Sequence, residues 1–319
     1  MAEDESKRRV TIVGTGAMAC LFGALLASRA RVTLTGTWRQ GLAAICASGI
    51  IIGEPQKDVA RRVNTAAWGD HVEPADLVLV LVKSWQTEEA ARRLPRLLKP
   101  GGVALTLQNG LGNMEALGPG ACLGVTYLGA TLLGPGRVHP GGSGNTFIAG
   151  PEWIVDLFHE AGIEAESRDS GQVDGLLWAK LAVNCGINAL TALLRVRNGE
   201  LLLRPDAAGL MERAALECAA VAVAKGISFP FADAAQKTRE VAQLTAANRS
   251  SMLQDMLRGA PTEIDAINGA TVRWGNRLGV PTPVNEILFR LVRAAVSTPC
   301  ATRRRKGWNA CKPSPTLPI

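Results

Sequence analysis

The stretch RRVTIVGTGAMACLFGALLASRARVTLTG, residues 8–36, predicts a strand, a glycine turn, a helix and a second strand. Residues 10–13 form a short apolar run rich in β-branched side chains, which is typical of a buried strand. Residues 17–28 have the composition of a helix, and the next strand begins at Val32. Strand–turn–helix–strand is the unit from which parallel sheets are built, so this stretch predicts an α/β fold.

The turn inside this stretch has the pattern G-x-G-x-x-A. Gly14 permits the tight turn, Gly16 lets the backbone approach a pyrophosphate, and Ala19 keeps the helix close to the sheet. The helix N-terminus then offers free N–H groups to the phosphates. A merely structural glycine turn is the alternative, and the strand–turn–helix context disfavours it. We therefore predict a dinucleotide site formed by Gly14, Thr15, Gly16, Ala17, Met18 and Ala19.

The alternation of strands and helices continues downstream. Residues 75–110 predict buried strands at 77–82 and 103–107, with a helix at 87–98 between them. Continuous apolar strands of this kind indicate a parallel sheet covered on both faces, whereas after about residue 170 Ala-rich helical stretches dominate. The prediction is an N-terminal Rossmann-type domain (1–170), an all-α C-terminal domain (171–300) and a basic, disordered tail (301–319).

Composition narrows the class of protein. A chain of 319 residues that is 47% hydrophobic and 20% charged is an ordinary globular protein with room for two cores. The start of the chain, MAEDESKRRV, leads directly into a short strand, so we expect no signal peptide and a cytoplasmic protein. Seven Cys and three His are scattered without metal-ligand spacing, so we expect no disulfide framework and no metal. A monomer or a homodimer is expected.

The net charge of +7 is concentrated in the tail. Residues 301–319 hold three Arg and two Lys and no acid, which accounts for +5 and leaves +2 for the rest of the chain. A Pro-rich basic terminus is most often solvated, and a body with one Tyr offers few platforms on which bases can stack. We therefore expect no nucleic-acid partner.

A polar stripe interrupts the apolar segment LLWAKLAVNCGINALTALL, residues 176–194. Lys180, Asn184 and Asn188 are spaced four apart, so on a helix they lie on one face. These side chains argue against a membrane span, and the apolar remainder predicts a helix packed between other elements. The stripe then faces either an internal polar network, with Lys180 reaching water along its stem, or a ligand-filled cleft. The segment alone leaves both open.

Several separate motifs resemble one known family. They are VKSWQT (82–87), QNGLGN (108–113), WAKLAVNCGINALTAL (178–193), RNGEL (197–201), SSMLQD (250–255) and TEIDAINGATVRWGNRLGVPTPVN (262–285). In this order they resemble the ketopantoate reductase (2-dehydropantoate 2-reductase) family, over the whole chain except its tail. The resemblance implies NADPH-dependent reduction of 2-dehydropantoate to pantoate, in pantothenate and coenzyme A biosynthesis.

The resemblance also implies roles for individual residues. Lys180 matches the proton donor, and Glu263 matches an acid between the cofactor and the reacting centre, which acts in catalysis and in cofactor binding. The positions that match cofactor contacts are Lys83, Asn109 and Ala130. The positions that match substrate contacts are Lys180, Asn184, Asn188, Asn198 and Ser251. Small 2-oxo acids are therefore the expected substrates.

The chemistry of these residue types agrees with a reductase. Hydride delivery to a ketone carbon builds negative charge on oxygen, and the Lys180 ammonium can stabilise that charge and then donate the proton. Burial would lower the pKa of Lys180, while a substrate carboxylate and Glu263 would raise it, and the sequence leaves the outcome open. Amides such as Asn184 orient a hydroxyl and a carboxylate without adding charge.

The preference for NADP(H) depends on the loop after the second strand, LTGTWRQG (34–41). It has no acid for a ribose 2′-hydroxyl, and Arg39, with Thr37, could meet a 2′-phosphate. An exposed, solvated Arg39 is the alternative. The family usually places an Arg closer to the strand, so the 2′-phosphate partner stays open.

Plainer interpretations exist for several of these residues. Thr262 and Asp265 form a T-x-x-D pattern, so Glu263 could simply favour the dipole of a helix that starts there. Asn109-Gly110 and Asn198-Gly199 are turn signals, and we assign His139 no role. For the whole protein, a reductase of another 2-oxo acid and a non-catalytic NADP(H)-binding module are the alternatives.

Overall fold

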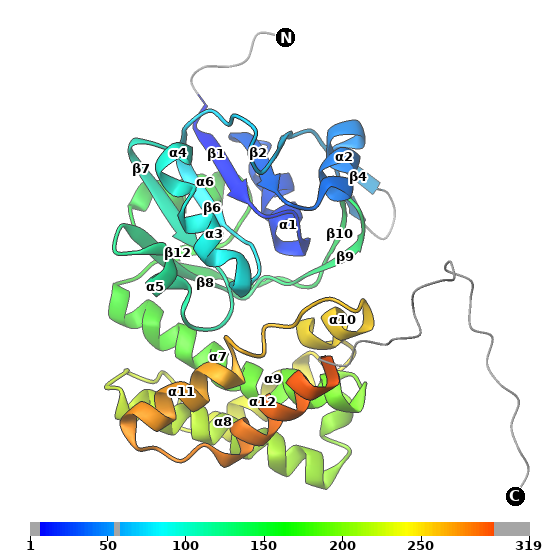
Figure 1. The fold of residues 1–319 in the computed structure, drawn as a ribbon, viewed down its shortest axis with the longest axis vertical. Coiled ribbons are helices and arrows are strands. Elements are labelled where there is room, and N and C mark those ends of the chain that lie inside the picture. Colours follow the sequence, from blue (N-terminus) through cyan, green and yellow to red (C-terminus); the bar gives the residue numbers. More distant parts are fainter. Residues whose placement is uncertain (1–6, 54–57, 297–319) are drawn as a thin grey trace, which may run out of the picture.

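The structure, a computed structural model, describes residues 7–53 and 58–296, so the predicted basic tail, residues 301–319, lies outside the described residues. Figure 1 shows the strands gathered in the upper part of the molecule and a group of helices in the lower part. An eight-stranded sheet has the order β12-β11-β8-β7-β6-β1-β2-β5, and its neighbours are parallel except β8 and β11. Its strands are β1 (Arg9–Val13), β2 (Arg31–Gly36), β5 (Asn64–Ala67), β6 (Ala75–Val80), β7 (Leu98–Thr106), β8 (Ala121–Thr126), β11 (Thr146–Ala149) and β12 (Ala165–Ser167).

Helices cover both faces of this sheet because its strands are apolar on both sides. Ile12 of β1 belongs to the core formed with α1 (Ala17–Leu26) and α6 (Glu152–Glu160), where Phe22 and Phe158 have ring centroids 5.7 Å apart. Its neighbour Val13 faces the other core, with α3 (Thr87–Ala91) and α4 (Leu94–Leu97). Successive side chains of a strand point to opposite faces, so both must be buried.

The expected single helix at 87–98 is divided. A 3₁₀ turn, η1 (Ser84–Gln86), precedes α3, and α4 begins separately with Pro95 in its first turn. Proline has no backbone N–H to donate to the carbonyl four residues earlier, so it interrupts a helix that comes before it. It is well tolerated in the first turn of a new helix. The remaining helices of this part are α2 (Arg39–Ser48) and α5 (Asn113–Leu117).

A second, smaller sheet was not expected from the sequence. It has the order β4-β3-β10-β9, with β3 (Ile50–Gly53), β4 (Asp58–Arg61), β9 (Ala130–Gly134) and β10 (Arg137–Pro140). The parallel pair β3–β10 places Ile52 opposite Val138. This sheet packs against α1, and residues 128–132, which enter and begin β9, lie at the carboxyl edge of the large sheet.

The second part of the chain is helical, as predicted. It contains α7 (Ser170–Leu194), η2 (Asn198–Leu201), α8 (Pro205–Ala224), α9 (Ala234–Leu244), α10 (Ser251–Leu257), α11 (Asn268–Leu278) and α12 (Pro283–Val296). The Asp169 side chain caps α7 by accepting a hydrogen bond from the Gln172 N–H at 2.9 Å. A sheet-containing part followed by a helical part confirms the predicted fold class.

Helix α7 lies between other elements. It contacts α8, α9, α10, α12 and β8, which confirms the expectation that it is packed on several sides. Among the described residues it is the one helix long and apolar enough to cross a membrane, and 72% of its most apolar window is buried inside the structure. Its apolar surface therefore has protein partners.

Candidate active site

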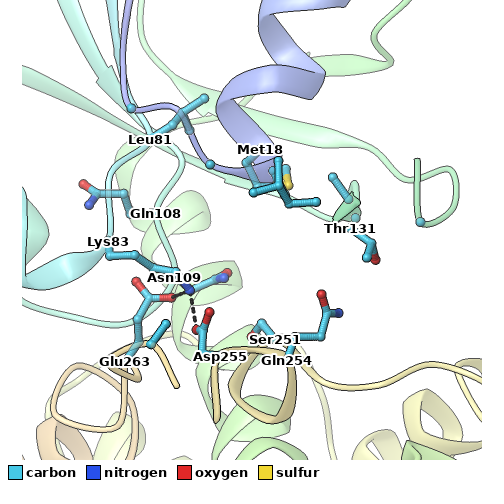
Figure 2. Close-up of a pocket in the computed structure, with 18 of the residues that line it drawn as sticks. Met18, Leu81, Lys83, Gln108, Asn109, Thr131, Ser251, Gln254, Asp255 and Glu263 are labelled. Atoms are coloured by element: carbon cyan, nitrogen blue, oxygen red, sulfur yellow. Dashed lines mark hydrogen bonds and ion pairs between the residues drawn. The ribbon is translucent and has the colours of Figure 1, made fainter. Parts of the chain in front are cut away.

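A cleft of about 1090 Å³ separates the carboxyl edge of the large sheet from the helical part. Figure 2 shows Met18 and Thr131 on one side of it, with Ser251, Gln254, Asp255 and Glu263 opposite. Parallel sheets bind ligands at this edge. The predicted site residues that line the cleft are Gly14, Thr15, Gly16, Ala17, Met18, Lys83, Asn109, Ala130, Lys180, Asn184, Ser251 and Glu263.

Four predicted site residues lie outside the cleft lining. Ala19 is fully buried in the core, and Arg39 is exposed at the start of α2, although its neighbours Thr37 and Trp38 line the cleft. Asn188 is 6% exposed on α7. Asn198 is 7% exposed, its Nδ2 donates to Thr245 Oγ1 at 2.9 Å, and its Oδ1 has no partner among the described residues.

The glycine turn has the geometry of a phosphate site. Gly14 has φ +140°, and a Cβ there would lie 2.8 Å from the Leu81 carbonyl oxygen, so this position requires glycine. At Gly16, by contrast, no atom lies within 4 Å of where a Cβ would be. Helix α1 begins at Ala17 without a side-chain cap, so its first N–H groups are available to an anion.

Lys180 reaches the cleft from the middle of α7. Its Nζ donates a hydrogen bond to the Thr126 carbonyl oxygen at the end of β8, at 2.5 Å, and lies 5.8 Å from the centre of the Tyr127 ring. Burial lowers the pKa of Lys180 from 10.5 to about 8, and the negative charge of Glu263 opposes this shift. Asn184, one turn further along α7, lines the same cleft. The amine can therefore gain or lose a proton near neutral pH.

A charged cluster connects the two parts of the chain across the cleft, as the dashed lines in Figure 2 mark. Lys83 Nζ lies 2.6 Å from Asp255 Oδ2 and 3.3 Å from Glu263 Oε2. Glu263 Oε1 also accepts a hydrogen bond from the Ser84 backbone N–H at 3.1 Å. Burial alone would lower the pKa of Lys83, but Glu263 and Asp255 outweigh it and raise that pKa above its usual value.

The plainer role for Glu263 is wrong. Helix α11 begins at Asn268 rather than at Thr262, so Glu263 does not lie in its first turn. The carboxylate is 6% exposed, and its partners are Lys83 and Ser84 on the other side of the cleft. Glu263 therefore binds residues of the sheet-containing part of the chain and does not stabilise the dipole of α11.

Asp255 lines the cleft without having been assigned a role from the sequence. It is 2% exposed, and its second oxygen, Oδ1, accepts from Arg258 Nη2 at 2.8 Å. Asp255 ends the motif SSMLQD, but a pattern of residues does not show that an acid is buried against a lysine 172 positions away. His139 also lines the cleft, with Nδ1 2.9 Å from the Gly53 carbonyl oxygen.

Comparison with known proteins gives matches over both parts of the chain. The family model described as ketopantoate reductase PanE/ApbA matches residues 10–152, and its C-terminal counterpart matches residues 172–296. A 2-dehydropantoate 2-reductase from Archaeoglobus fulgidus is 35% identical over 302 residues, which cover 91% of this chain and 98% of the relative.

Solved structures agree in fold. A PanE/ApbA family ketopantoate reductase from Ralstonia eutropha has a TM-score of 0.83 at 35% identity, and D-mandelate dehydrogenase with NADH and anilino(oxo)acetate has 0.85 at 27%. Both matches cover 90% of this chain and 98% of the other. The chain therefore belongs to the ketopantoate reductase PanE/ApbA family and is an oxidoreductase.

Proposed function

We propose that this protein reduces 2-dehydropantoate (ketopantoate) to pantoate with NADPH, with Lys180 as the proton donor, in pantothenate and coenzyme A biosynthesis. The observation that carries the proposal is the presence of the Lys180 amine and the glycine turn in one cleft. A non-catalytic nucleotide-binding module would have no use for a buried amine at that place. The expected cytoplasmic location, and a monomer or homodimer, stay predictions, as does the domain division at residues 170 and 300.

The cleft fits a dinucleotide. The open space at Gly16 and the uncapped start of α1 suit a pyrophosphate, and Asn109 and Ala130 line the cleft beyond them, where a nicotinamide would lie. When bound, a reduced nicotinamide supplies the hydride for the ketone carbon. Lys83 and Glu263 are proposed to hold the cofactor at the boundary between the two parts of the chain.

Lys180 is proposed to act on the ketone oxygen. As negative charge develops there, the ammonium donates a hydrogen bond and then a proton, and the amine takes a new proton from solvent. The hydrogen bond from Nζ to the Thr126 carbonyl oxygen orients the amine, and because this acceptor is uncharged it does not neutralise the ammonium. Asn184 and Ser251 in the lining are proposed to orient the carboxylate and the hydroxyl of the substrate. Substrate contacts by Asn188 and Asn198, which lie outside the lining, stay predictions.

The substrate class is tested with a panel of 2-oxo acids. The likeness to D-mandelate dehydrogenase favours, as a second candidate, reduction of another 2-oxo acid. Oxidation of NADPH, followed by its absorbance with ketopantoate, pyruvate, 2-oxoisovalerate and phenylglyoxylate, separates the candidates by kcat/KM. We expect the highest value with ketopantoate, and a higher value with phenylglyoxylate would assign the second function instead.

The choice of nucleotide is tested in the same assay. No acidic residue follows β2, which favours NADPH over NADH. Of the two residues that could bind the 2′-phosphate, Thr37 lines the cleft and Arg39 does not. We expect a higher kcat/KM with NADPH than with NADH, and Arg39→Ala should reduce this ratio. A ratio that the substitution leaves unchanged would remove Arg39 from the proposed site.

The pH dependence of turnover tests the role of Lys180. With a pKa of about 8, the amine is mostly protonated below that pH and neutral above it. Because only the ammonium can donate a proton, kcat/KM, which reports the free enzyme, should fall as the pH rises through about 8. Glu263→Gln removes the charge that raises this pKa, so the fall should move to lower pH. The exposed acid Glu286, changed to Gln, provides a control that should leave the profile in place.

A further inference from the structure

A network of buried polar side chains lies behind the turn that follows β7. Its members are Thr87, Thr106, Gln108 and Asn113, which are 1%, 1%, 8% and 5% exposed. Thr106 and Gln108 are at the end of β7, while Thr87 begins α3 and Asn113 begins α5. The network therefore joins segments that reach the cleft from two neighbouring strands.

Gln108 is the centre of this network. Its Nε2 donates to the Val82 carbonyl oxygen at 2.8 Å and to Thr87 Oγ1 at 2.9 Å, and its Oε1 accepts from Thr106 Oγ1 at 2.9 Å. Thr87 Oγ1 in turn donates to Asn113 Oδ1 at 2.9 Å. The Nδ2 of Asn113 donates to the Asn109 carbonyl oxygen at 3.1 Å, which closes the network on the cleft.

The chemistry of these groups fixes the orientation of the Gln108 amide. The Val82 carbonyl can only accept, so the amide nitrogen must face it, and rotation of the amide by half a turn would place two acceptors against each other. Both amide hydrogens of Gln108 are used. Because the network is buried and each of these donors has an acceptor, it allows one arrangement of the chain around it.

This arrangement matters because the backbone ladder between β6 and β7 ends before the cleft. The last pair in the ladder is Val80 with Thr106, and beyond it no ladder pair joins the two segments. The Gln108 side chain bridges them by holding the carbonyl of Val82, the residue immediately before Lys83. Figure 2 shows Gln108 on the same side of the cleft as Lys83 and Asn109.

We propose that Gln108 is a positioning residue that fixes Lys83 and Asn109 relative to each other for binding of the nicotinamide nucleotide. The inference rests on the proposed function, because it takes the nucleotide to contact these two residues. Gln108 also lines the cleft, but both of its amide hydrogens are used by Val82 and Thr87, so it is proposed to act through its neighbours. Its loss should affect the affinity for the nucleotide more than the affinity for the 2-oxo acid.

The test is direct binding of NADPH, measured from the change in nucleotide fluorescence without substrate. Gln108→Met keeps the length of the side chain and removes all three of its hydrogen bonds. We expect it to raise the Kd for NADPH about tenfold, a loss of the order seen when buried polar groups lose their partners. Thr87→Val removes the hydrogen bonds that Thr87 makes to Gln108 and Asn113, and it should also raise the Kd for NADPH. In the double variant, Gln108→Met with Thr87→Val, the increase in Kd should be smaller than the product of the two single increases.

A control variant distinguishes an effect on nucleotide binding from a general loss of stability. Asn285 is 0% exposed, its Nδ2 donates to the Ala214 carbonyl oxygen at 2.9 Å, and it lies outside the cleft lining. Asn285→Leu should lower the Tm with an unchanged Kd for NADPH. If Gln108→Met lowers the Tm but leaves the Kd for NADPH unchanged, the positioning role of Gln108 is overturned. The proposed function is not affected by that result. A wild-type chain that binds neither NADPH nor NADH would overturn the proposed function, and the inference with it.

Discussion

Lys180→Ala should lower kcat/KM for ketopantoate about 10³-fold while the Kd for NADPH stays within about twofold of the wild-type value. The variant loses the proposed proton donor and, with it, the cation proposed to face the developing negative charge. It leaves the glycine turn intact, since Lys180 comes from α7 and its hydrogen bond is to Thr126 on β8. Steady-state rates and fluorescence titration of NADPH measure the two quantities separately.

Two further variants locate the source of that loss. Lys180→Arg keeps a cation that does not deprotonate in the accessible pH range, so the fall in kcat/KM near pH 8 should disappear along with most of the activity. Lys237→Ala removes an exposed amine that pairs with Glu240 on α9, and its activity should equal the wild type. Near-normal turnover in Lys180→Ala would exclude this residue as the proton donor.

Gly16→Asp should raise the Kd for NADPH about 100-fold or more and at the same time stabilise the fold. The site has room for the side chain, because no atom lies within 4 Å of a Cβ there and the backbone φ of −80° suits any residue. Aspartate at this position would cap α1 with its carboxylate and repel the pyrophosphate from the same N–H groups. An increase on the order of a few tenths of a kcal/mol in the free energy of unfolding should accompany the loss of binding, because glycine is already a tolerated N-cap.

Gly209→Asp supplies the matched control for the added charge. Gly209 lies on α8, outside the cleft lining, and a Cβ there also meets no atom within 4 Å. Its Kd for NADPH should not change. If Gly16→Asp binds NADPH as the wild type does, the glycine turn is not the phosphate site.

The local patterns of the chain predict the elements that line the candidate site. The glycine turn between β1 and α1 depends on a few neighbouring residues, and the stripe of Lys180 and Asn184 depends only on helical spacing. Both therefore follow from sequence. The division of the helix at 87–98 also has a local signal, because Pro95 cannot continue a helix that precedes it.

Features that depend on distant pairings do not follow from local patterns. The small sheet joins residues near 51 with residues near 137, and four short strands of this kind show little periodicity. The contact of Lys83 with Asp255 is similar, because each is an ordinary charged residue until the fold buries them together. The distance of Arg39 from the glycine turn along the sequence predicts a cofactor contact, but the residue lies outside the cleft lining.

The small sheet has a consequence for biosynthesis. β3 has β4 on one edge and β10 on the other, so a nascent chain that has emerged only as far as residue 100 leaves one edge of β3 unpaired. During elongation that edge can pair with other polypeptides, and chaperones that shield exposed strands would act on it until β10 leaves the ribosome.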